Sequence, residues 1–236
     1  MKKHIPNILT CCNLFTGCIS MVMALRGNLE IASILIFVAA LFDFLDGFAA
    51  RMLKVNSDIG VDMDSLADVF SFGGAPAMIM FVWTERCMGN LPPSVQEMGF
   101  VQLLPYFVFI IPAFSALRLA HFNHDDRQRN EFRGLATPAN ALFLGFLHFS
   151  SIHLPILSNF WVLLVLTLIF SILLISDIPM FALKFKDLKF RGNEIRYLFL
   201  AASLALLIIF RLGAFPIIIL TYILISFVTA FIRKTQ

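Results

Sequence analysis

Eight stretches of predominantly apolar residues follow one another along this chain, and each is close to the length of a membrane-spanning helix. A helix needs about 20 such residues to cross a bilayer. The stretches lie near residues 8–26, 29–50, 60–82, 101–121, 137–154, 156–177, 195–211 and 213–232. Hydrophobic residues make up 59% of the sequence and the mean hydropathy is +0.87, far above the usual values for a soluble domain. We therefore predict an all-α integral membrane protein of about eight transmembrane helices, with residues 1–236 forming a single transmembrane domain.

The first apolar stretch follows Lys2 and Lys3, an arrangement that also occurs in secretory signal peptides. Polar residues interrupt this stretch at every third position, and no small-residue cleavage site follows it. These residues are Asn7, Thr10, Asn13 and Thr16. We therefore interpret the stretch as a retained first helix.

The basic residues predict the orientation of the chain in the membrane. If the eight spans alternate in direction, all but three of the 18 Lys and Arg residues fall on one side, and the exceptions are Arg26, Arg86 and Arg211. Since cytoplasmic loops carry the excess of Lys and Arg, both termini and the 51–59 connection are predicted to be cytoplasmic. The net charge of +3 is spread over these membrane-edge loops, so it does not indicate a nucleic-acid partner.

Four aspartates stand inside the second and third apolar stretches, at Asp43, Asp46, Asp64 and Asp68. A charge at the bilayer centre costs roughly 2.5–3.5 kcal/mol on insertion scales, so such acids are expected to face a partner, a metal ion or a water-filled cavity. Residues three or four apart share a helix face. Because the 52–59 connection is short, we expect the two helices to be antiparallel neighbours whose acidic faces converge near their cytoplasmic ends.

Four converging carboxylates predict a site for hard divalent cations, since oxygen ligands suit Mg²⁺ and Mn²⁺. Two such ions balance the four negative charges and keep open positions for phosphate oxygens, which favours a diphosphate substrate. The same faces carry Gly47, Ala50 and Gly60, whose small size lets a bulky charged group approach the backbone. Arg51 either pairs with phosphate or anchors the end of its helix.

The string D43-x-x-D46-G47-x-x-A50-R51-x8-G60-x-x-x-D64-x-x-x-D68 resembles the signature of the CDP-alcohol phosphatidyltransferases at every position. The resemblance implies a six-helix core, here residues 1–177 with the signature at 43–68, followed by two C-terminal helices at about 195–232. It also implies a homodimer, metal binding by Asp43, Asp46, Asp64 and Asp68, and nucleotide and phosphate binding by Gly47, Ala50, Arg51 and Gly60. Asp68 is further implied to be the base that takes the proton of an attacking alcohol, with CMP released.

Four further segments resemble the phosphatidylserine synthases of this family, whose substrates are CDP-diacylglycerol and L-serine. They are P-N-I-L-T-C-C-N-L at 6–14, D-S-L-A-D-V-F-S-F-G-G-A-P-A at 64–77, A-L-R-L-A-H-F-N at 116–123 and F-R-G-L-A-T-P-A-N at 132–140. Ala136 and His121 depart from the pattern of this branch. A pocket selective for serine should supply a cation and a hydrogen-bond acceptor near Asp68, so we expect Ser71, Arg118 and Arg133 to contribute to it.

Two alternatives remain open from the sequence. A relative that uses another acceptor, glycerol 3-phosphate or inositol phosphate, would share the signature but need a more cationic pocket. A divalent-cation transporter would use the acids as its permeation site, but it gives no reason for the Gly, Ala and Arg spacing. The small single-domain build favours a bacterial inner membrane, with the active site facing the cytoplasm.

Overall fold

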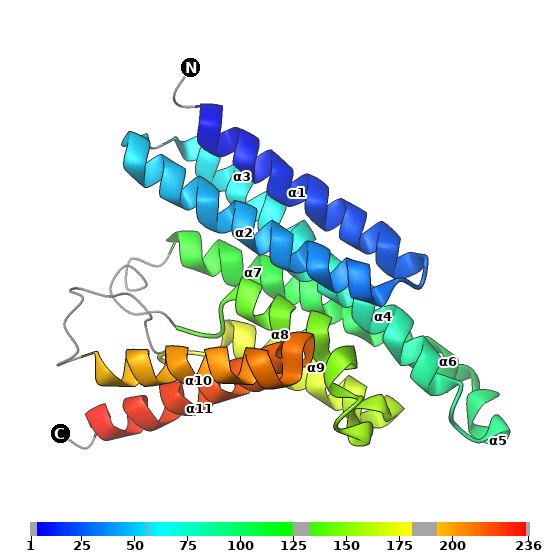
Figure 1. Cartoon of the computed structure of the whole chain (residues 1–236). Coiled ribbons are helices and arrows are strands. Elements are labelled where there is room, and N and C mark those ends of the chain that lie inside the picture. The colour runs from blue at the N-terminus through cyan, green and yellow to red at the C-terminus, as the bar shows by residue number, and fades with distance from the viewer. Residues whose placement is uncertain (1–3, 56, 125–132, 181–192, 235–236) are drawn as a thin grey trace.

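The computed structural model describes residues 4–55, 57–124, 133–180 and 193–234, and these residues are almost entirely helical (Figure 1). No strand occurs within these ranges, so the predicted all-α class is confirmed. The helices are α1 (His4–Leu25), α2 (Leu29–Leu53), α3 (Asp58–Asp68), α4 (Ala75–Met88), α5 (Pro93–Gln96), α6 (Gly99–Leu103), α7 (Ile110–His124), α8 (Thr137–Ser150), α9 (Phe160–Ile175), α10 (Glu194–Phe210) and α11 (Ala214–Lys234). A π-helical segment, η1 (Val69–Gly74), joins α3 to α4, while 3₁₀ segments join others: η2 (Leu104–Phe109), η4 (Pro155–Ser158) and η5 (Arg211–Gly213).

Within the described ranges, five helical stretches are long and apolar enough to cross a membrane. They are His4–Leu25, Leu29–Leu53, Asp58–Met88, Gly99–His124 and Glu194–Thr229, the last of which comprises α10 and most of α11, with the chain turning at η5 between them. The predicted spans 137–154 and 156–177 are shorter than expected. Helix α8 ends at Ser150, and α9 begins only at Phe160, where Asn159 caps it by accepting from the Trp161 backbone N–H at 3.0 Å.

The helices run back and forth, as the alternating charge pattern predicts. In Figure 1 the start of α1, the end of α11 and the connection from α2 to α3 lie toward the left. The α1–α2 turn, α5 and the α10–α11 turn lie toward the right. Parts of two connections assigned to the cytoplasmic side, 125–132 and 181–192, lie outside the described residues.

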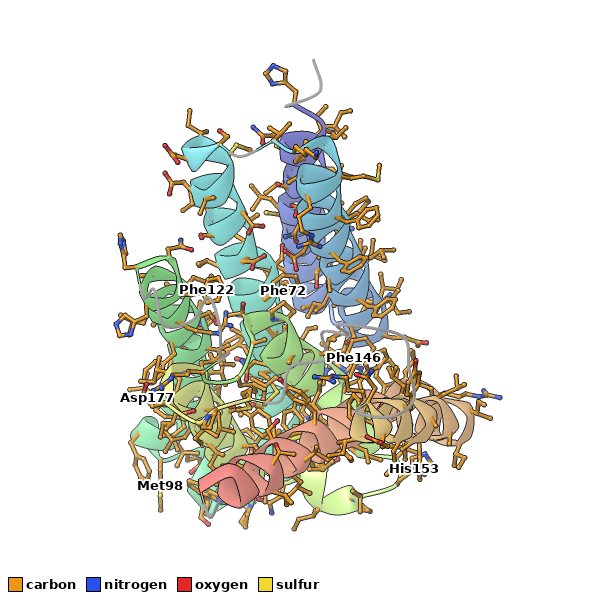
Figure 2. All side chains as sticks on the ribbon, turned by 90° about the vertical axis from the view of Figure 1, so that its left-hand side faces the viewer. Phe72, Met98, Phe122, Phe146, His153 and Asp177 are labelled. Atoms are coloured by element: carbon orange, nitrogen blue, oxygen red, sulfur yellow. The ribbon has the colours of Figure 1, made fainter. Side chains whose placement is uncertain are left out.

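Polar side chains are buried and apolar ones are exposed along α1, the reverse of a soluble protein. Thr10, Asn13 and Ser20 lie inside, while Ile8 and Phe15 are more than half exposed. Aromatic side chains occupy both environments: Figure 2 shows Phe72 and Phe146, which are buried, between the helices, and Phe122, which is exposed, at the edge. A lipid environment accounts for this pattern, because lipid tails solvate the apolar faces and leave the polar groups to pair with one another.

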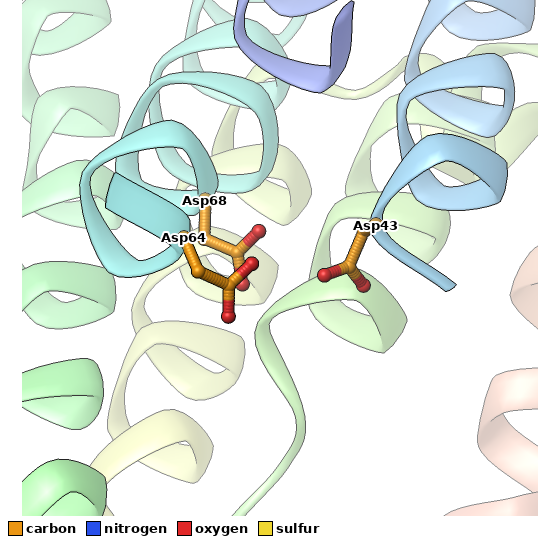
Figure 3. A group of neighbouring side chains, drawn as sticks. All are labelled: Asp43, Asp64 and Asp68. Atoms are coloured by element: carbon orange, nitrogen blue, oxygen red, sulfur yellow. The ribbon is translucent and has the colours of Figure 1, made fainter. Parts of the chain in front are cut away.

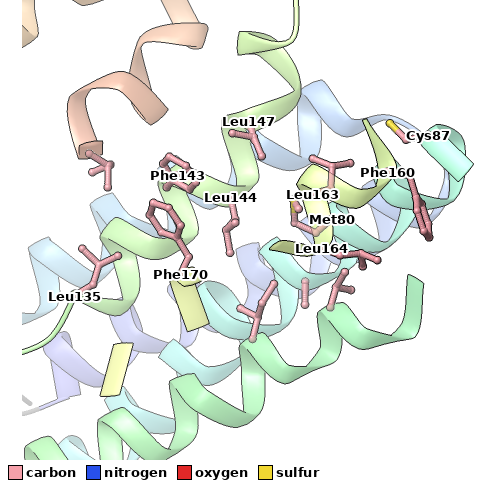
Figure 4. Close-up of a cluster of buried hydrophobic side chains, with 14 of the residues drawn as sticks. Met80, Cys87, Leu135, Phe143, Leu144, Leu147, Phe160, Leu163, Leu164 and Phe170 are labelled. Carbon is pink, nitrogen blue, oxygen red and sulfur yellow. The ribbon is translucent and has the colours of Figure 1, made fainter. Parts of the chain in front are cut away.

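The larger apolar core lies where α4, α7, α8 and α9 meet (Figure 4). At its centre the rings of Phe143 and Phe170 are stacked with centroids 3.6 Å apart. A smaller cluster joins α2 to α4 and α8, where the Ser33 hydroxyl donates to the Gly145 carbonyl at 2.5 Å. A Cβ on Gly145 would lie 2.9 Å from Ile36 Cδ1, so this glycine permits the close approach of α2 and α8.

Candidate functional site

Three of the four predicted aspartates meet between α2 and α3 (Figure 3). One carboxylate oxygen each from Asp43, Asp64 and Asp68 lies within 4.8 Å of the other two. The local sequence sets this geometry. Lys54 closes α2 in a left-handed conformation with φ of 51°, and the Ser57 hydroxyl caps α3 by accepting from the Gly60 backbone N–H at 3.4 Å. The short turn between them brings the two acidic faces together, as predicted, but α2 and α3 each pack against α1 rather than closely against one another.

The carboxylate cluster of Asp43, Asp64 and Asp68 has the chemistry of a divalent-cation site. Oxygens this close repel one another, and Asp64 Oδ1 is buried without a hydrogen-bond partner. A buried unpaired carboxylate oxygen is costly, and a hard cation with oxygen ligands removes both the repulsion and the missing contact. The residues present therefore fit a bound Mg²⁺ or Mn²⁺ ion.

Asp46 lies one turn further along α2 than Asp43, and its side chain is held by the first helix. The Thr10 hydroxyl donates to Asp46 Oδ2 at 2.6 Å, and Asn13 Nδ2 donates to Asp68 Oδ1 at 3.2 Å. All three of Thr10, Asn13 and Asp68 are buried. Helix α1 thus supports two of the four acids, a role that the signature alone does not predict. The period-three polar residues of 7–16 were the available signal, because such spacing keeps them near one helix face.

A cleft of about 430 Å³ opens beside the aspartates, between the start of α1, the end of α2 and the start of α3. Asp46 and Asp64 line it together with Gly47, Ala50 and Gly60, whereas Asp43 and Asp68 are not among its lining residues. All of these positions were predicted to share one site, and the structure brings them together. The remaining lining residues are Pro6, Asn7, Thr10, Val55, Ser57, Asp58 and Val61.

The glycine positions keep the cleft open. A Cβ on Gly47 would lie 3.7 Å from a terminal nitrogen of Arg51, so the Arg51 guanidinium lies beside Gly47, although Arg51 is not among the residues that line the cleft. A Cβ on Gly60 would lie 3.5 Å from Asn7 Oδ1. A guanidinium beside an open cleft can bind phosphate through two parallel hydrogen bonds. The shape and charge of the cleft thus suit a phosphate-bearing ligand that also contacts metal ions.

Helix α3 continues directly after Asp68 into the wider π-helical segment η1, where the sequence predicted a continuous α-helix. Such segments are frequent at functional sites. Ser71 lies in this segment, fully buried, and its hydroxyl donates to the Asn13 carbonyl at 3.0 Å. A Cβ on Gly17 of α1 would lie 2.7 Å from the Ser71 Cα. Ser71 therefore lies in a tight contact between α1 and η1, and its hydroxyl is already engaged there.

The two predicted arginines occupy different surroundings. Arg118 is 8% exposed, lies within electrostatic range of Asp68, and donates to the Thr137 hydroxyl of α8 at 3.3 Å. Arg133 lies in the segment before α8 and pairs with the exposed Asp177 at 3.8 Å. Arg118 is thus a buried cation near the carboxylate cluster, whereas Arg133 makes a partly exposed ion pair.

Comparison with known proteins identifies the family. The family model of the CDP-alcohol phosphatidyltransferases matches residues 3–226. A CDP-diacylglycerol–serine O-phosphatidyltransferase of Helicobacter pylori is 31% identical over 141 residues, which are 59% of this chain and 54% of that protein. One of Bacillus subtilis is 31% identical over 148 residues, 63% of this chain and 77% of that protein. An archaetidylserine synthase of Methanothermobacter thermautotrophicus is 29% identical over 177 residues, 74% of this chain and 68% of that protein.

The match spans about half the length of the Helicobacter pylori relative and more of the other two. The family match, by contrast, covers nearly the whole chain, including the carboxylate cluster and the cleft. Together with the apolar helices, it shows that this chain is an integral membrane protein of the CDP-alcohol phosphatidyltransferase family.

Proposed function

We propose that this protein is a phosphatidylserine synthase, which transfers the phosphatidyl group of CDP-diacylglycerol to the hydroxyl of L-serine and releases CMP. The observation that carries the proposal is the carboxylate cluster, which shares Asp64 with a cleft lined by Gly47, Ala50 and Gly60. The activities for which the similar proteins are named favour serine as the acceptor.

Asp43, Asp46, Asp64 and Asp68 would hold two divalent ions, Mg²⁺ or Mn²⁺, in keeping with the general metal dependence of the family. When bound, such ions stabilise the attacking and leaving oxygens of an in-line displacement at phosphorus. The hydrogen bonds from Thr10 and Asn13 fix two of these carboxylates in place before any ligand binds.

The cleft would receive the cytidine diphosphate part of the donor. Gly47, Ala50 and Gly60 leave space for it along α2 and α3, and the Arg51 guanidinium would pair with a phosphate. The diacylglycerol chains would remain in the lipid that surrounds the apolar helix faces.

In the reaction, the serine hydroxyl oxygen attacks the phosphorus that carries the diacylglycerol. A new oxygen–phosphorus bond forms, the bond between this phosphorus and the oxygen bridging to CMP breaks, and CMP leaves with that oxygen. Asp68 takes the hydroxyl proton, since a carboxylate within hydrogen-bond reach of an attacking hydroxyl acts as a general base. Asn13 would hold Asp68 in the orientation that this step needs.

Arg118 is the favoured member of the proposed serine pocket, because it is a buried cation near the proposed base. Ser71 would contribute by holding η1 against α1, and Arg133 by ordering the segment before α8 through its pair with Asp177. Glycerol 3-phosphate and inositol phosphate carry a phosphate with more charge than a carboxylate, so those acceptors call for more than one buried cation.

We further propose that the whole chain is one transmembrane domain, with a core up to about residue 177 and two additional C-terminal helices. The positive-inside distribution supports a bacterial inner membrane with both termini and the cleft toward the cytoplasm. A homodimer is the proposed assembly, and cross-linking in membranes tests it.

The decisive experiment measures CMP release by the purified protein in CDP-diacylglycerol micelles with Mn²⁺, with L-serine, glycerol 3-phosphate, inositol phosphate or no acceptor. Mass analysis identifies the lipid product. We expect serine-dependent CMP release and phosphatidylserine. Release driven by another alcohol would refute the choice of acceptor, and no release with any acceptor would refute the proposed reaction.

A further inference from the structure

Asn140, in the first turns of α8, is a buried amide without a partner. Its side chain is fully buried, and neither Nδ2 nor Oδ1 makes a hydrogen bond. Burying an unpaired amide is unfavourable, so nearly all buried amides are paired with protein, water or a ligand. An amide that offers one free acceptor and two free donor hydrogens in the interior indicates a polar ligand.

The surroundings of Asn140 show which ligand fits. Thr137 precedes it by three residues and so shares its face of α8, and the Thr137 hydroxyl accepts from Arg118. Arg118 Nε is also buried without a hydrogen-bond partner. Arg118 is in turn within electrostatic range of Asp68. A buried group of polar side chains, with unused donors and one unused acceptor, therefore lies where Arg118 of α7 meets the start of α8, and the Arg118 guanidinium interacts electrostatically with the proposed base.

We infer that Asn140 determines acceptor specificity by binding the amino-acid end of the acceptor together with Arg118 and Thr137. The inference rests on the proposed function and extends it. The Arg118 guanidinium and the Asn140 amide N–H bind the carboxylate, and Asn140 Oδ1 accepts from the ammonium group. A free α-amino acid with a side-chain hydroxyl satisfies every unpaired atom in this group and leaves its hydroxyl free to reach Asp68.

The polar groups of this subsite also predict which acceptors it rejects. Ethanolamine lacks the carboxylate and leaves Arg118 unpaired, and 3-hydroxypropanoate lacks the ammonium and leaves Asn140 Oδ1 unpaired. Sites built to hydrogen-bond a polar substrate group discriminate strongly against analogues that lack it, because their own buried groups then stay unpaired. The protein should therefore use L-serine in preference to both analogues.

The test is steady-state kinetics of the full-length Asn140→Leu variant, which removes the amide and keeps a similar volume. We expect KM for L-serine to rise about 10- to 100-fold, as fits the loss of one or two hydrogen bonds to charged groups. KM for CDP-diacylglycerol should stay within about twofold of the unsubstituted protein, because the cleft is lined by other helices. Asn140→Asp is the second variant, since its carboxylate would pair with Arg118 and should also raise KM for L-serine.

The matched control is Ser171→Ala in α9. It removes a hydroxyl that, like the Asn140 amide, is fully buried and has no hydrogen-bond partner. It should leave both KM values unchanged. Stabilisation of each variant by L-serine in thermal melts gives a readout independent of turnover, and it should be lost only in the two Asn140 variants. If the unsubstituted protein makes phosphatidylserine but folded Asn140 variants keep their KM for L-serine, the inference alone is overturned. If the unsubstituted protein neither binds nor uses L-serine, the inference and the proposed function both fall.

Discussion

The hydrogen bond from Asn13 to Asp68 offers a direct test of how α1 contributes to catalysis. Asn13 is fully buried, and its Nδ2 is the donor to Asp68 Oδ1 at 3.2 Å. The Asn13→Leu variant keeps a similar side-chain volume and removes this donor. The backbone carbonyl of residue 13, which accepts from the Ser71 hydroxyl, is unchanged. The variant therefore isolates the bond that orients the proposed base.

A hydrogen bond to a charged group contributes about 1.5–3 kcal/mol. If the whole of this is lost from the transition state, kcat falls by roughly 10- to 150-fold, because about 1.4 kcal/mol corresponds to a factor of ten. KM for CDP-diacylglycerol should change little, since residue 13 is not among those that line the cleft. The Mn²⁺ concentration for half-maximal activity should rise, because Asp68 is a member of the carboxylate cluster.

The assay is CMP release at saturating CDP-diacylglycerol and L-serine, with a Mn²⁺ titration for each variant. Thr16→Val is the control, because the Thr16 hydroxyl lies on the same helix but bonds to the Cys12 carbonyl of its own backbone at 2.7 Å. Its kcat and Mn²⁺ titration should match those of the unsubstituted protein. A folded Asn13→Leu variant with kcat within about twofold of that protein would refute the positioning role.

Three further predictions use other parts of the site. Asp68→Asn should lower kcat by about 10²- to 10⁴-fold, the usual contribution of a general base, while gel filtration in detergent stays unchanged; near-normal kcat would exclude Asp68 as the base. Gly17→Ala should lower the free energy of unfolding by about 1–3 kcal/mol, because its Cβ would lie 2.7 Å from the Ser71 Cα. In Gly60→Ala the new Cβ would lie 3.5 Å from the nearest atom, so this variant should melt normally but have a higher KM for CDP-diacylglycerol. Equal melting temperatures for the two variants would contradict the packing argument. Chelation by EDTA should abolish CMP release, and Mn²⁺ or Mg²⁺ should restore it; activity that persists after chelation would argue against metal ions in the carboxylate cluster.

The sequence predicted much of the fold because lipid imposes simple rules. An apolar stretch of sufficient length must be helical, since a bilayer offers no partners for free backbone groups. The acids were equally visible, because charges are rare at that depth. Helical spacing was enough to place Asp46 with Gly47, and Asp64 with Gly60, on faces that line one cleft.

Other features depend on contacts that no local pattern encodes. The π-helical widening at 69–74 follows from the packing of η1 against α1 and α7, where Gly17 and Gly73 admit close approach. A Cβ on Gly73 would lie 3.0 Å from Pro112 Cα. Helix α8 ends four residues before its predicted end because a turn and a 3₁₀ segment follow Ser150. The partners of Asp46 and Asp68 on α1 lie 36 and 55 residues away in sequence, beyond the reach of helical periodicity.

The proposed nucleotide cleft and the proposed acceptor subsite belong to two different sets of helices. The cleft proposed for the nucleotide lies among α1, α2 and α3, whereas Arg118, Thr137 and Asn140 belong to α7 and α8. Asp68 lies at the boundary, at the end of α3 and directly before η1, which packs against both α7 and α8. If the proposed acceptor subsite is correct, substitutions in α7 and α8 should change the acceptor without moving the carboxylates, because the carboxylates stand on α2 and α3.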